Sequence, residues 1–367
     1  MALRVVGNRL LNGVGRPVQL VGVNRSGTEF SCIQGSGIFD GPSDEPSVRA
    51  IADWRVNAVR VPLNEDCWLG LNGVSPAFSG QSYRTALIDY VRLLHRYGQF
   101  VELSLTWVAP GQQQATSQFP MPDADHAADF WRSVAVAFRD DPAVFFGAYG
   151  EPHDIGWACW RDGGATCPTP YSAVGMQDLV NVIRSAGAEQ PIALPGIDRA
   201  NDLSSWLDFQ PRDSRRSLIA EFHVYNFNAC HNLSCWQKTV LPVSTHVPVT
   251  TSEVGEDDCH GGFLDAYLPF ADGNGISYMA WAWNTWKKCT ALITAYSGVP
   301  TAYGFVYRED LTQRTPGAAM PSTAEVAKKP VGRAISPPLL TAAGGGLLAL
   351  GLILWALLAR RRKSQGS

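Results

Sequence analysis

Short runs of apolar residues alternate along the chain with longer stretches in which apolar residues recur every three or four positions. The short runs are rich in β-branched and aromatic side chains, which predicts buried strands. We expect eight strands, at residues 18–23, 58–63, 100–107, 144–149, 192–196, 218–223, 247–251 and 276–281. The longer stretches predict amphipathic helices, among them residues 47–54, 83–97, 127–138 and 171–186.

This alternation over about 300 residues indicates an α/β fold, namely a parallel (β/α)8 barrel of the TIM type. An open, doubly wound sheet would give the same periodicity and remains the alternative. Residues 3–17 contain turn signals at Gly7-Asn8 and Asn12-Gly13, so we expect a small hairpin that closes the barrel floor. The predicted barrel domain comprises residues 1–310.

The C-terminal part has a different composition. Residues 311–338 are rich in Pro, Ala, Thr and Ser, which predicts a linker. Residues 339–359 are uncharged and long enough to span a bilayer, and a basic tail follows at residues 360–367. The Arg and Lys side chains of that tail predict a cytoplasmic C-terminus. A buried core helix is the less favoured alternative for residues 339–359.

This orientation places residues 1–310 outside the cytoplasm, so we expect an export signal ahead of the barrel. Residues 1–7 do not supply the apolar stretch and cleavage site of such a signal. A start placed too late and a trimmed chain both account for this. The eight cysteines agree with export, because an even number in predicted loops favours disulfides. Proximity favours the pairs Cys159–Cys167 and Cys230–Cys235, with some thiols possible as free groups.

Composition and charge restrict the function. The 46% hydrophobic and 10% aromatic content describes a globular protein with a full core. The net charge is −3 for the whole chain and −7 without the basic tail, which argues against nucleic acid as a partner. The sequence contains no phosphate-binding glycine loop or dinucleotide fingerprint, so no cofactor is expected. The 12 Trp fit either a core or a sugar-stacking surface.

Polar and aromatic side chains gather at the predicted carboxyl ends of the strands, where TIM barrels carry their chemistry. Two of them are glutamates about 100 residues apart, Glu151 and Glu253, each beyond an apolar run. A carboxylate at such a place is costly to desolvate unless it has partners or a task. Two carboxylates on separate strands are what a glycosidase requires.

Six short motifs carry a resemblance to a known family. They are Gly22-Val23-Asn24-Arg25-Ser26-Gly27, Asn57-Ala58-Val59-Arg60-Val61-Pro62-Leu63, Leu105-Thr106-Trp107 with Ala109-Pro110-Gly111, Gly150-Glu151-Pro152, His223-Val224-Tyr225 and Ser252-Glu253. In order and spacing, over roughly residues 3–305, the chain resembles the retaining glycoside hydrolases of family 5. The resemblance implies a carbohydrate substrate and requires no metal or other cofactor.

The resemblance also implies a role for each matched residue. Glu151 is the expected general acid/base, with a pKa raised by burial and by Glu253, and Glu253 is the expected nucleophile. The expected supporting and substrate-binding residues are Tyr225 as a donor to Glu253, Arg60 as its positive partner, His223 beside Glu151, Trp107 as a wall, and Trp283 (or else Trp281) as the stacking floor. His223 as a plain core histidine is the alternative.

Two positions depart from the family pattern. Gly150 stands where an Asn normally holds the sugar 2-hydroxyl, and Thr106 replaces a His before Trp107. Both changes predict an atypical subsite, for a reacting sugar that differs at or near C2. Other acidic residues are interpreted as solvated loop charges, namely Glu65, Asp66, Glu256, Asp257 and Asp258. The run 257–260 lacks a facing set of metal ligands.

The sequence therefore predicts a membrane-anchored, extracytoplasmic retaining glycosidase that acts by double displacement. A transglycosylase that remodels envelope glycans is one alternative, and a weakly catalytic carbohydrate-binding barrel is another. Neither the sugar, the endo or exo mode, nor the oligomeric state follows from the sequence.

Overall fold

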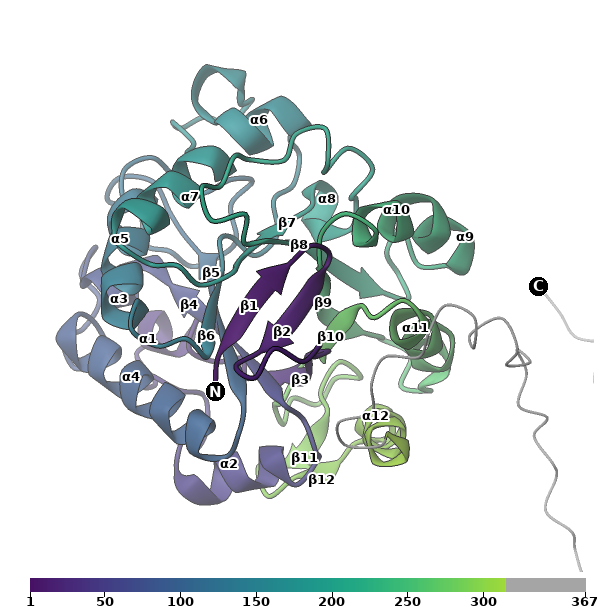
Figure 1. Ribbon diagram of the computed structural model, residues 1–367. Coiled ribbons are helices and arrows are strands. Elements are labelled where there is room, and N and C mark those ends of the chain that lie inside the picture. Colours follow the sequence, from purple (N-terminus) through teal and green to yellow (C-terminus); the bar gives the residue numbers. More distant parts are fainter. Residues whose placement is uncertain (315–367) are drawn as a thin grey trace, which may run out of the picture. The chain divides into compact units, whose positions relative to one another are not determined.

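The computed structural model describes residues 1–314, which form a closed barrel of eight parallel strands with helices around it (Figure 1). Around the barrel the strand order is β10-β3-β4-β5-β6-β7-β8-β9. The strands are β3 (Val21–Asn24), β4 (Ala58–Asn64), β5 (Phe100–Trp107), β6 (Val144–Gly147), β7 (Ile192–Pro195), β8 (Leu218–Tyr225), β9 (Val249–Gly255) and β10 (Ser277–Ala280). The predicted (β/α)8 barrel is confirmed, and closure of the sheet excludes the open alternative.

The strands are connected by helices and helical turns. They are α1 (Ser31–Gln34), α2 (Glu45–Ala52), α3 (Glu65–Leu69), α4 (Gln81–Arg96), α5 (Ala127–Phe138), α6 (Trp157–Asp162), α7 (Met176–Ser185), α8 (Ile197–Ala200), α9 (Leu233–Cys235), α10 (Leu241–Ser244), α11 (Gly262–Gly273) and α12 (Ala302–Gln313). The four helices predicted from periodicity correspond to α2, α4, α5 and α7. A short pair of strands, β11 (Ile293–Ala295) and β12 (Val299–Pro300), precedes α12.

Strand β9 is longer than the sequence predicted, and this changes the setting of Glu253. Its pairing with β8 continues to Tyr225↔Gly255, past a register shift between Phe222 and His223. Glu253 therefore lies within a strand and is held on both sides by the sheet. Glu151, by contrast, follows four residues after the end of β6 at Gly147.

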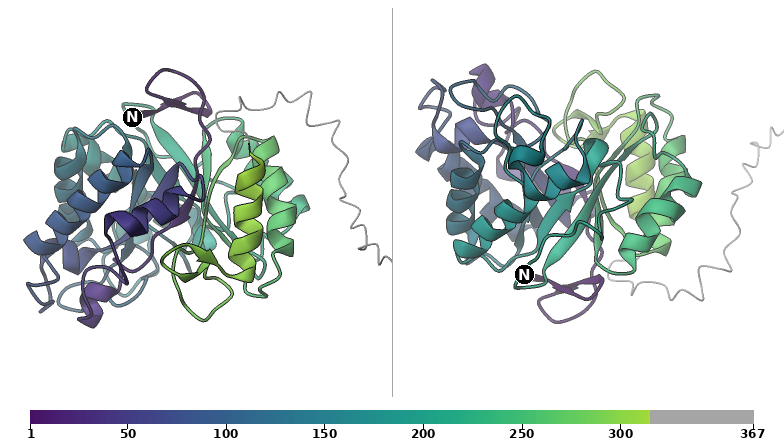
Figure 2. Two further views of the ribbon diagram at one scale, coloured as in Figure 1. Left: turned by 90° about the horizontal axis from the view of Figure 1, so that it is seen from below. Right: turned by 90° about the horizontal axis from the view of Figure 1, so that it is seen from above.

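A small antiparallel hairpin, β1 (Leu3–Val6) and β2 (Arg9–Asn12), closes one end of the barrel (Figure 2). Its loop is Gly7-Asn8, and Gly7 has a φ of 59°, a left-handed conformation that glycine adopts without strain. Leu3 and Leu10 of the hairpin are buried in one cluster with residues of the amino ends of the strands, such as Phe100. The predicted floor is confirmed, and the opposite face is left for the carboxyl ends of the strands.

More than half of the tryptophans belong to the core, including Trp54, which is 2% exposed. Six of the 12 have side chains that are less than 2% exposed, namely Trp68, Trp131, Trp160, Trp206, Trp236 and Trp283. Most of this core lies between the barrel and the surrounding helices, where it forms one large cluster. The high Trp content is thus explained in part by packing, and fewer tryptophans remain for contact with sugars.

All eight cysteines form disulfides. The pairs are Cys32–Cys67, Cys159–Cys167, Cys230–Cys235 and Cys259–Cys289. The predicted framework and both local pairs are confirmed, and the possibility of free thiols is excluded.

Helix α12 continues to Gln313, so the barrel's last helix runs slightly past the predicted boundary at residue 310. Within residues 1–314, every helix is too short or too polar to cross a membrane. The predicted transmembrane segment 339–359, the basic tail and nearly all of the linker lie outside the described residues.

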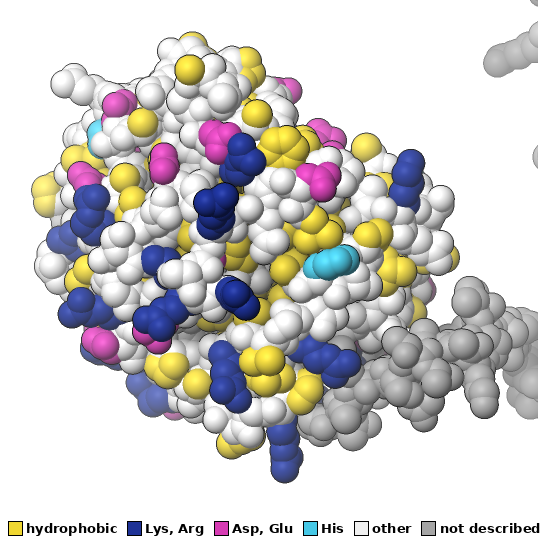
Figure 3. Space-filling view, turned by 45° about the horizontal axis from the view of Figure 1, so that its top comes forward, with side chains coloured by type: hydrophobic (Ala, Val, Ile, Leu, Met, Phe, Trp, Pro, Cys, Tyr) yellow, Lys and Arg dark blue, Asp and Glu magenta, His cyan; other side chains and the backbone are white. Residues whose placement is uncertain are grey.

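Charged side chains of both signs are spread over the barrel surface. On the face in Figure 3, Asp and Glu lie mainly toward the top of the view, and Lys and Arg prevail below them. Hydrophobic side chains lie singly or in small groups between them. This face therefore has a mixed, polar character.

Candidate active site

Glu151 and Glu253 come together at the carboxyl face of the barrel. One carboxylate oxygen of each, together with a ring nitrogen of His223, lies within 4.8 Å of the other two atoms. A separation of about 5–5.5 Å between carboxyl groups suits a nucleophile and an acid/base on one glycosidic bond, whereas about 6.5–9.5 Å would be needed for an inverting enzyme. The geometry thus fits double displacement with retention.

Two donors hold Glu253. Arg60 of β4 donates from Nη1 to Oε1 at 2.6 Å, and the Tyr225 hydroxyl of β8 donates to Oε2 at 2.6 Å. Both are charge-assisted hydrogen bonds to a side chain that is only 6% exposed. The contacts expected of Arg60 and Tyr225 are present, and they fix the position of the Glu253 carboxylate. The roles of these residues in turnover stay predictions.

Glu151 is held by two basic residues. His223 Nδ1 lies 3.1 Å from Oε1, and Arg199 Nη1 lies 3.4 Å from Oε2. Burial alone would raise the pKa of Glu151, but the hydrogen bond and charge of His223 and the charge of Arg199 lower it below its ordinary value. The sequence-based expectation of a raised pKa was wrong for the free barrel. It placed His223 beside Glu151 but considered only burial and Glu253 for the pKa, and it missed Arg199.

The His223 ring contacts the partly exposed Glu151 on one side and the buried Glu221 on the other. Burial would lower its pKa, but Glu253 and the hydrogen bonds to Glu151 and Glu221 raise that pKa to about 10. On the other side of the ring, Nε2 lies 2.9 Å from the Ser252 hydroxyl, which donates to Glu221. The ring is therefore not a plain core histidine, since both of its nitrogens face the site's carboxylates or their partners.

A layer of buried carboxylates that the sequence did not predict lies beneath Glu151 and Glu253. Glu102 and Glu221 are fully buried and lie 3.3 and 3.7 Å from the Arg60 guanidinium. Burial and the charge of Glu221 raise the pKa of Glu102 to about 8. For Arg60, burial opposes the charged form, but the surrounding carboxylates raise its pKa. A single acidic residue inside an apolar strand run was the signal that could have revealed them.

Gly150 and Thr106 adjoin each other, as expected of residues on one wall. A Cβ atom at Gly150 would lie 3.5 Å from Thr106 Cγ2, and 3.2 Å from Nε2 of Gln118. Gln118, from the long loop between β5 and α5, thus places an amide beside the position of the missing side chain. Nothing in the periodicity of the sequence pointed to this residue.

The aromatic residues differ from the prediction in which rings are buried and which are exposed. Trp283 is fully buried and packs edge-on against Trp54 at 4.9 Å, so it has no free face for a sugar. The expectation of Trp283 as the stacking floor was therefore wrong. Trp281, the alternative, is partly exposed. A row of partly exposed rings, with neighbouring centroids 6.2 Å apart, runs through Trp107, Phe30, Trp286 and Trp281.

Three of the presumed loop charges are not solvated. Glu65, Asp66 and Glu256 are fully buried, which corrects the sequence interpretation. Asp257 and Asp258 are exposed, and the neighbouring Cys259 is in a disulfide, so the run 257–260 has no thiolate to offer a metal. The trio Glu151, His223 and Glu253 has metal-like spacing, but Arg60 and Tyr225 already occupy the Glu253 oxygens.

Comparison with known sequences gives one family and several relatives. The profile of the family described as cellulase (glycosyl hydrolase family 5) matches residues 12–287. Endoglucanase CelA of Streptomyces lividans is 25% identical over 289 residues, which cover 77% of this chain and 56% of that protein. Endoglucanase 1 of Saitozyma flava is 26% identical over 235 residues, covering 57% and 60%. The chain therefore spans less than two thirds of these relatives.

Solved structures share the fold at low identity. The beta-glucanase SdGluc5_26A from Saccharophagus degradans has a TM-score of 0.66 and 18% identity, with 85% of this chain and 93% of that chain covered. The catalytic domain of Thermobifida fusca endoglucanase Cel5A has a TM-score of 0.61 and 18% identity, with 85% and 97% covered. At this identity the likeness concerns the barrel architecture alone.

Proposed function

Because the chain belongs to glycosyl hydrolase family 5, the cellulase family, and its barrel is thus a glycosidase domain, we propose that it is a retaining hydrolase of a β-linked polysaccharide. The observation that carries the proposal is the approach of Glu151 and Glu253 within 4.8 Å. Relatives named endoglucanases and a beta-glucanase make β-glucan the first substrate to test.

In the first step, Glu253 attacks the anomeric carbon while Glu151 protonates the departing oxygen. The glycosidic bond breaks and a glycosyl ester to Glu253 forms. Arg60 and Tyr225 orient the carboxylate before attack through hydrogen bonds of 2.6 Å each. In the second step, Glu151 takes a proton from water, whose oxygen replaces Glu253 on the sugar.

Glu151 must take up the proton for the first step when the sugar binds. The pKa of His223 is about 10, so its ring is an imidazolium at neutral pH, and Nδ1 lies 3.1 Å from Glu151. A bound sugar that displaces water and the half-exposed Arg199 removes stabilisation from the Glu151 carboxylate. The pKa of Glu151 then rises, Oε1 takes up a proton from solvent, and the His223 ring keeps its contact with Ser252 through Nε2.

The subsite for the reacting sugar has an atypical set of side chains. Gln118 supplies an amide next to Gly150, where other members have the Asn that holds the 2-hydroxyl. The subsite is thus rebuilt from a neighbouring loop, with Thr106 in place of a bulkier His beside it. This arrangement is compatible with glucose at the site and makes a sugar altered at C2 unnecessary.

The placement outside the cytoplasm and the membrane anchor are part of the proposal. Four disulfides favour an oxidising compartment. The uncharged segment 339–359, followed by Arg360, supports a single-pass anchor with a cytoplasmic C-terminus. Activity at the surface of intact cells that moves to the medium on deletion of residues 339–367 would support this location, and activity confined to the cytosol would contradict it.

The activity is tested with a 2-fluoro glucoside or cellobioside that traps the glycosyl ester, followed by peptide mass spectrometry. Labelling of Glu253, together with an inactive but folded Glu253→Ala variant, is the expected result. Label on another residue would contradict the assignment of the nucleophile. Aryl glycosides that differ at C2 then identify the sugar, and we expect the glucose configuration to be cleaved fastest.

A binding barrel without catalysis is the alternative from another class. It requires neither the paired carboxylates nor the donors on Glu253. Oligosaccharide binding with no turnover and no label on Glu253 would favour it. A product longer than the substrate would instead indicate transfer to a second sugar.

A further inference from the structure

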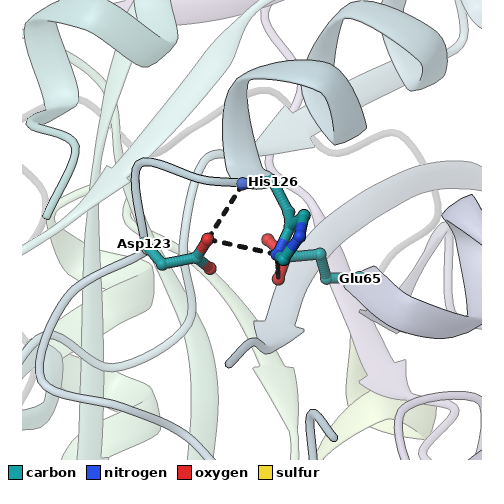
Figure 4. Close-up of side chains that lie close together, drawn as sticks. All are labelled: Glu65, Asp123 and His126. Carbon is teal, nitrogen blue, oxygen red and sulfur yellow. Dashed lines mark hydrogen bonds and ion pairs between the residues drawn. The ribbon is translucent and has the colours of Figure 1, made fainter. Parts of the chain in front are cut away.

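A second cluster of titratable side chains lies in the barrel and shares no residue with the catalytic set (Figure 4). Glu65 opens α3 directly after β4, Asp123 lies in the loop between β5 and α5, and His126 immediately precedes α5. One possible ligand atom from each lies within 4.8 Å of the other two. Figure 4 shows the Asp123 carboxylate directed toward the His126 ring, with the Glu65 carboxylate beside that ring.

Each of these side chains has polar atoms that the described protein leaves unsatisfied. Glu65 and Asp123 are fully buried. Asp123 Oδ1 accepts the backbone N–H groups of Asp125 and His126 at 3.0 and 2.9 Å. Glu65 Oε1 accepts the Ala109 N–H at 3.4 Å. The second oxygens, Oε2 and Oδ2, and His126 Nδ1 have no hydrogen-bond partner among the described residues. Buried polar atoms normally do have partners.

A proton shared between the Glu65 and Asp123 carboxyl groups would give these oxygens a partner, but it would leave His126 Nδ1 without one among the described residues. His126 Nδ1, however, lies 3.4 Å from Asp123 Oδ1 and 3.8 Å from Glu65 Oε1. These separations are long for hydrogen bonds. Ligand atoms around a tetrahedral ion with bonds of 2.0–2.2 Å lie about 3.3–3.6 Å apart. The separation of 3.4 Å falls within this range, and that of 3.8 Å lies slightly above it.

We propose that Glu65, Asp123 and His126 bind one divalent first-row transition-metal ion, Zn²⁺ or Mn²⁺. The imidazole disfavours Mg²⁺ and Ca²⁺, which prefer oxygen ligands, and the set contains no thiolate that would favour a soft ion. The His126 side chain is 20% exposed, so the site is accessible to the ion and to a water as a further ligand.

The ion would fix the loop that carries Gln118. Glu65 and its neighbour Asp66 belong to α3, whereas Asp123 and His126 end the segment that follows β5. Asp66 already holds this segment, because its Oδ2 accepts the Ala115 N–H at 2.9 Å and its Oδ1 accepts from Asn72. A bound ion adds a second link between the same two parts. Its role is structural, since neither catalytic glutamate contributes a ligand.

The test uses the full chain after treatment with a chelator, titrated with ZnCl2 or MnCl2 alone. Metal content after desalting gives the stoichiometry, and the thermal midpoint gives a readout independent of activity. We expect one ion per chain and a raised midpoint. His126→Ala should weaken binding by about tenfold or more, because it removes one of three protein ligands. Glu65→Gln keeps the side-chain volume and removes a buried charge, so it should lose the ion while it stays folded.

His260→Ala is the matched control, because His260 pairs with Asp258 at 3.7 Å on the exposed surface. It should bind the ion as the unaltered chain does. Three results would overturn the proposal: no ion bound at micromolar concentration, an equal loss in His260→Ala, or a loss in Glu253→Gln but not in His126→Ala. The last result would place the ion at the catalytic trio. A Glu65→Gln variant that gains stability while the unaltered chain binds no ion would indicate a shared proton.

Discussion

His223 Nδ1 lies 3.1 Å from Glu151 Oε1, which joins the expected acid/base to a ring that stays protonated at neutral pH. The contact keeps the Glu151 carboxylate ionised in the free barrel, against the effect of burial. A general acid must nevertheless hold a proton when the bond breaks. His223 is therefore a positioning residue with two effects, because it orients Glu151 and sets its protonation.

Replacement of His223 by Gln should move the pH profile of kcat/KM. The positive ring lowers the pKa of Glu151, so its removal raises that pKa, and Glu151 stays protonated to higher pH. We expect the basic limb to shift upward and kcat to fall about tenfold or more, because the acid loses its support. The profile is measured with an aryl cellobioside from pH 4 to 9.

His95→Gln is the control for this variant. His95 also contacts a carboxylate, Asp141, at 3.1 Å, but both belong to the outer helices and loops. Its profile should match that of the unaltered chain. A basic limb that stays in place or moves downward in His223→Gln would contradict the proposed coupling.

The buried network should make folding stability depend on pH in a defined direction. Glu102 has a pKa of about 8 in the folded barrel, above the ordinary value of 4.5, so the folded state binds its proton more tightly. The stabilisation of the folded state by this proton is fully present below about pH 4.5 and is lost as the pH rises toward 8. His223 acts in the same sense, from its ordinary value of 6.5 to about 10. The free energy of unfolding should therefore decline from pH 5 to 8 through these groups.

Glu102→Gln should flatten this decline, which urea unfolding at several pH values would measure. Asp213→Asn is the matched control. Arg184 and the backbone hydrogen bonds lower the Asp213 pKa despite burial, so its contribution is lost only as the pH falls through the acidic range. It should leave the slope between pH 5 and 8 unchanged. A Glu102→Gln variant with an undiminished slope would show that the charge of Glu102 does not govern this range.

The sequence predicted the barrel because each of its strands keeps an apolar run that packing on both faces requires. It also predicted Glu151, Glu253, Arg60 and Tyr225 together, since carboxyl ends of parallel strands meet on one face. It could not predict Gln118, which lies in a loop without periodicity between β5 and α5. Local spacing cannot specify where such a loop places a side chain.

The error at Trp283 has a related physical cause. β10 ends at Ala280, so beyond that residue the alternation of strand faces no longer determines where a side chain points. Trp281 stays partly exposed, whereas Trp283 turns into the core against Trp54. Arg199, the second cationic partner of Glu151, was missed for the same reason, because it comes from a turn with positive φ angles at residues 198–200.

The two tryptophans should respond in opposite ways to replacement. Trp281→Ala removes a partly exposed ring beside Trp286, so we expect KM for cello-oligosaccharides to rise several-fold with little change in thermal midpoint. Trp283→Ala empties a fully buried site and should lower the free energy of unfolding by about 3–5 kcal/mol. Chemical unfolding and steady-state kinetics on both variants separate the effects. An unchanged KM in Trp281→Ala would remove this ring from the proposed sugar surface.

The amide of Gln118 should substitute for the Asn that Gly150 replaces. Gln118→Ala removes the amide beside Gly150, so kcat should fall more than KM changes, because a bond to the 2-hydroxyl strengthens in the transition state. We expect a loss of about 10- to 100-fold in kcat/KM, on the scale of one strong hydrogen bond. A 2-deoxy substrate should show a much smaller difference between the two proteins.

Restoration by a second change makes this test specific. The Gln118 amide lies 3.2 Å from the position of a Cβ at Gly150, so Gln118→Ala frees space for a side chain there. Adding Gly150→Asn to Gln118→Ala should therefore recover part of the activity. Gly150→Asn alone should lower kcat/KM or leave it unchanged, because the new Asn amide and the Gln118 amide would then compete for one position. Gln114→Ala is the control on the same loop, since its amide donates to Asn72 on the exposed surface. Equal losses in Gln114→Ala and Gln118→Ala, without recovery in the double variant, would show that Gln118 only supports the loop.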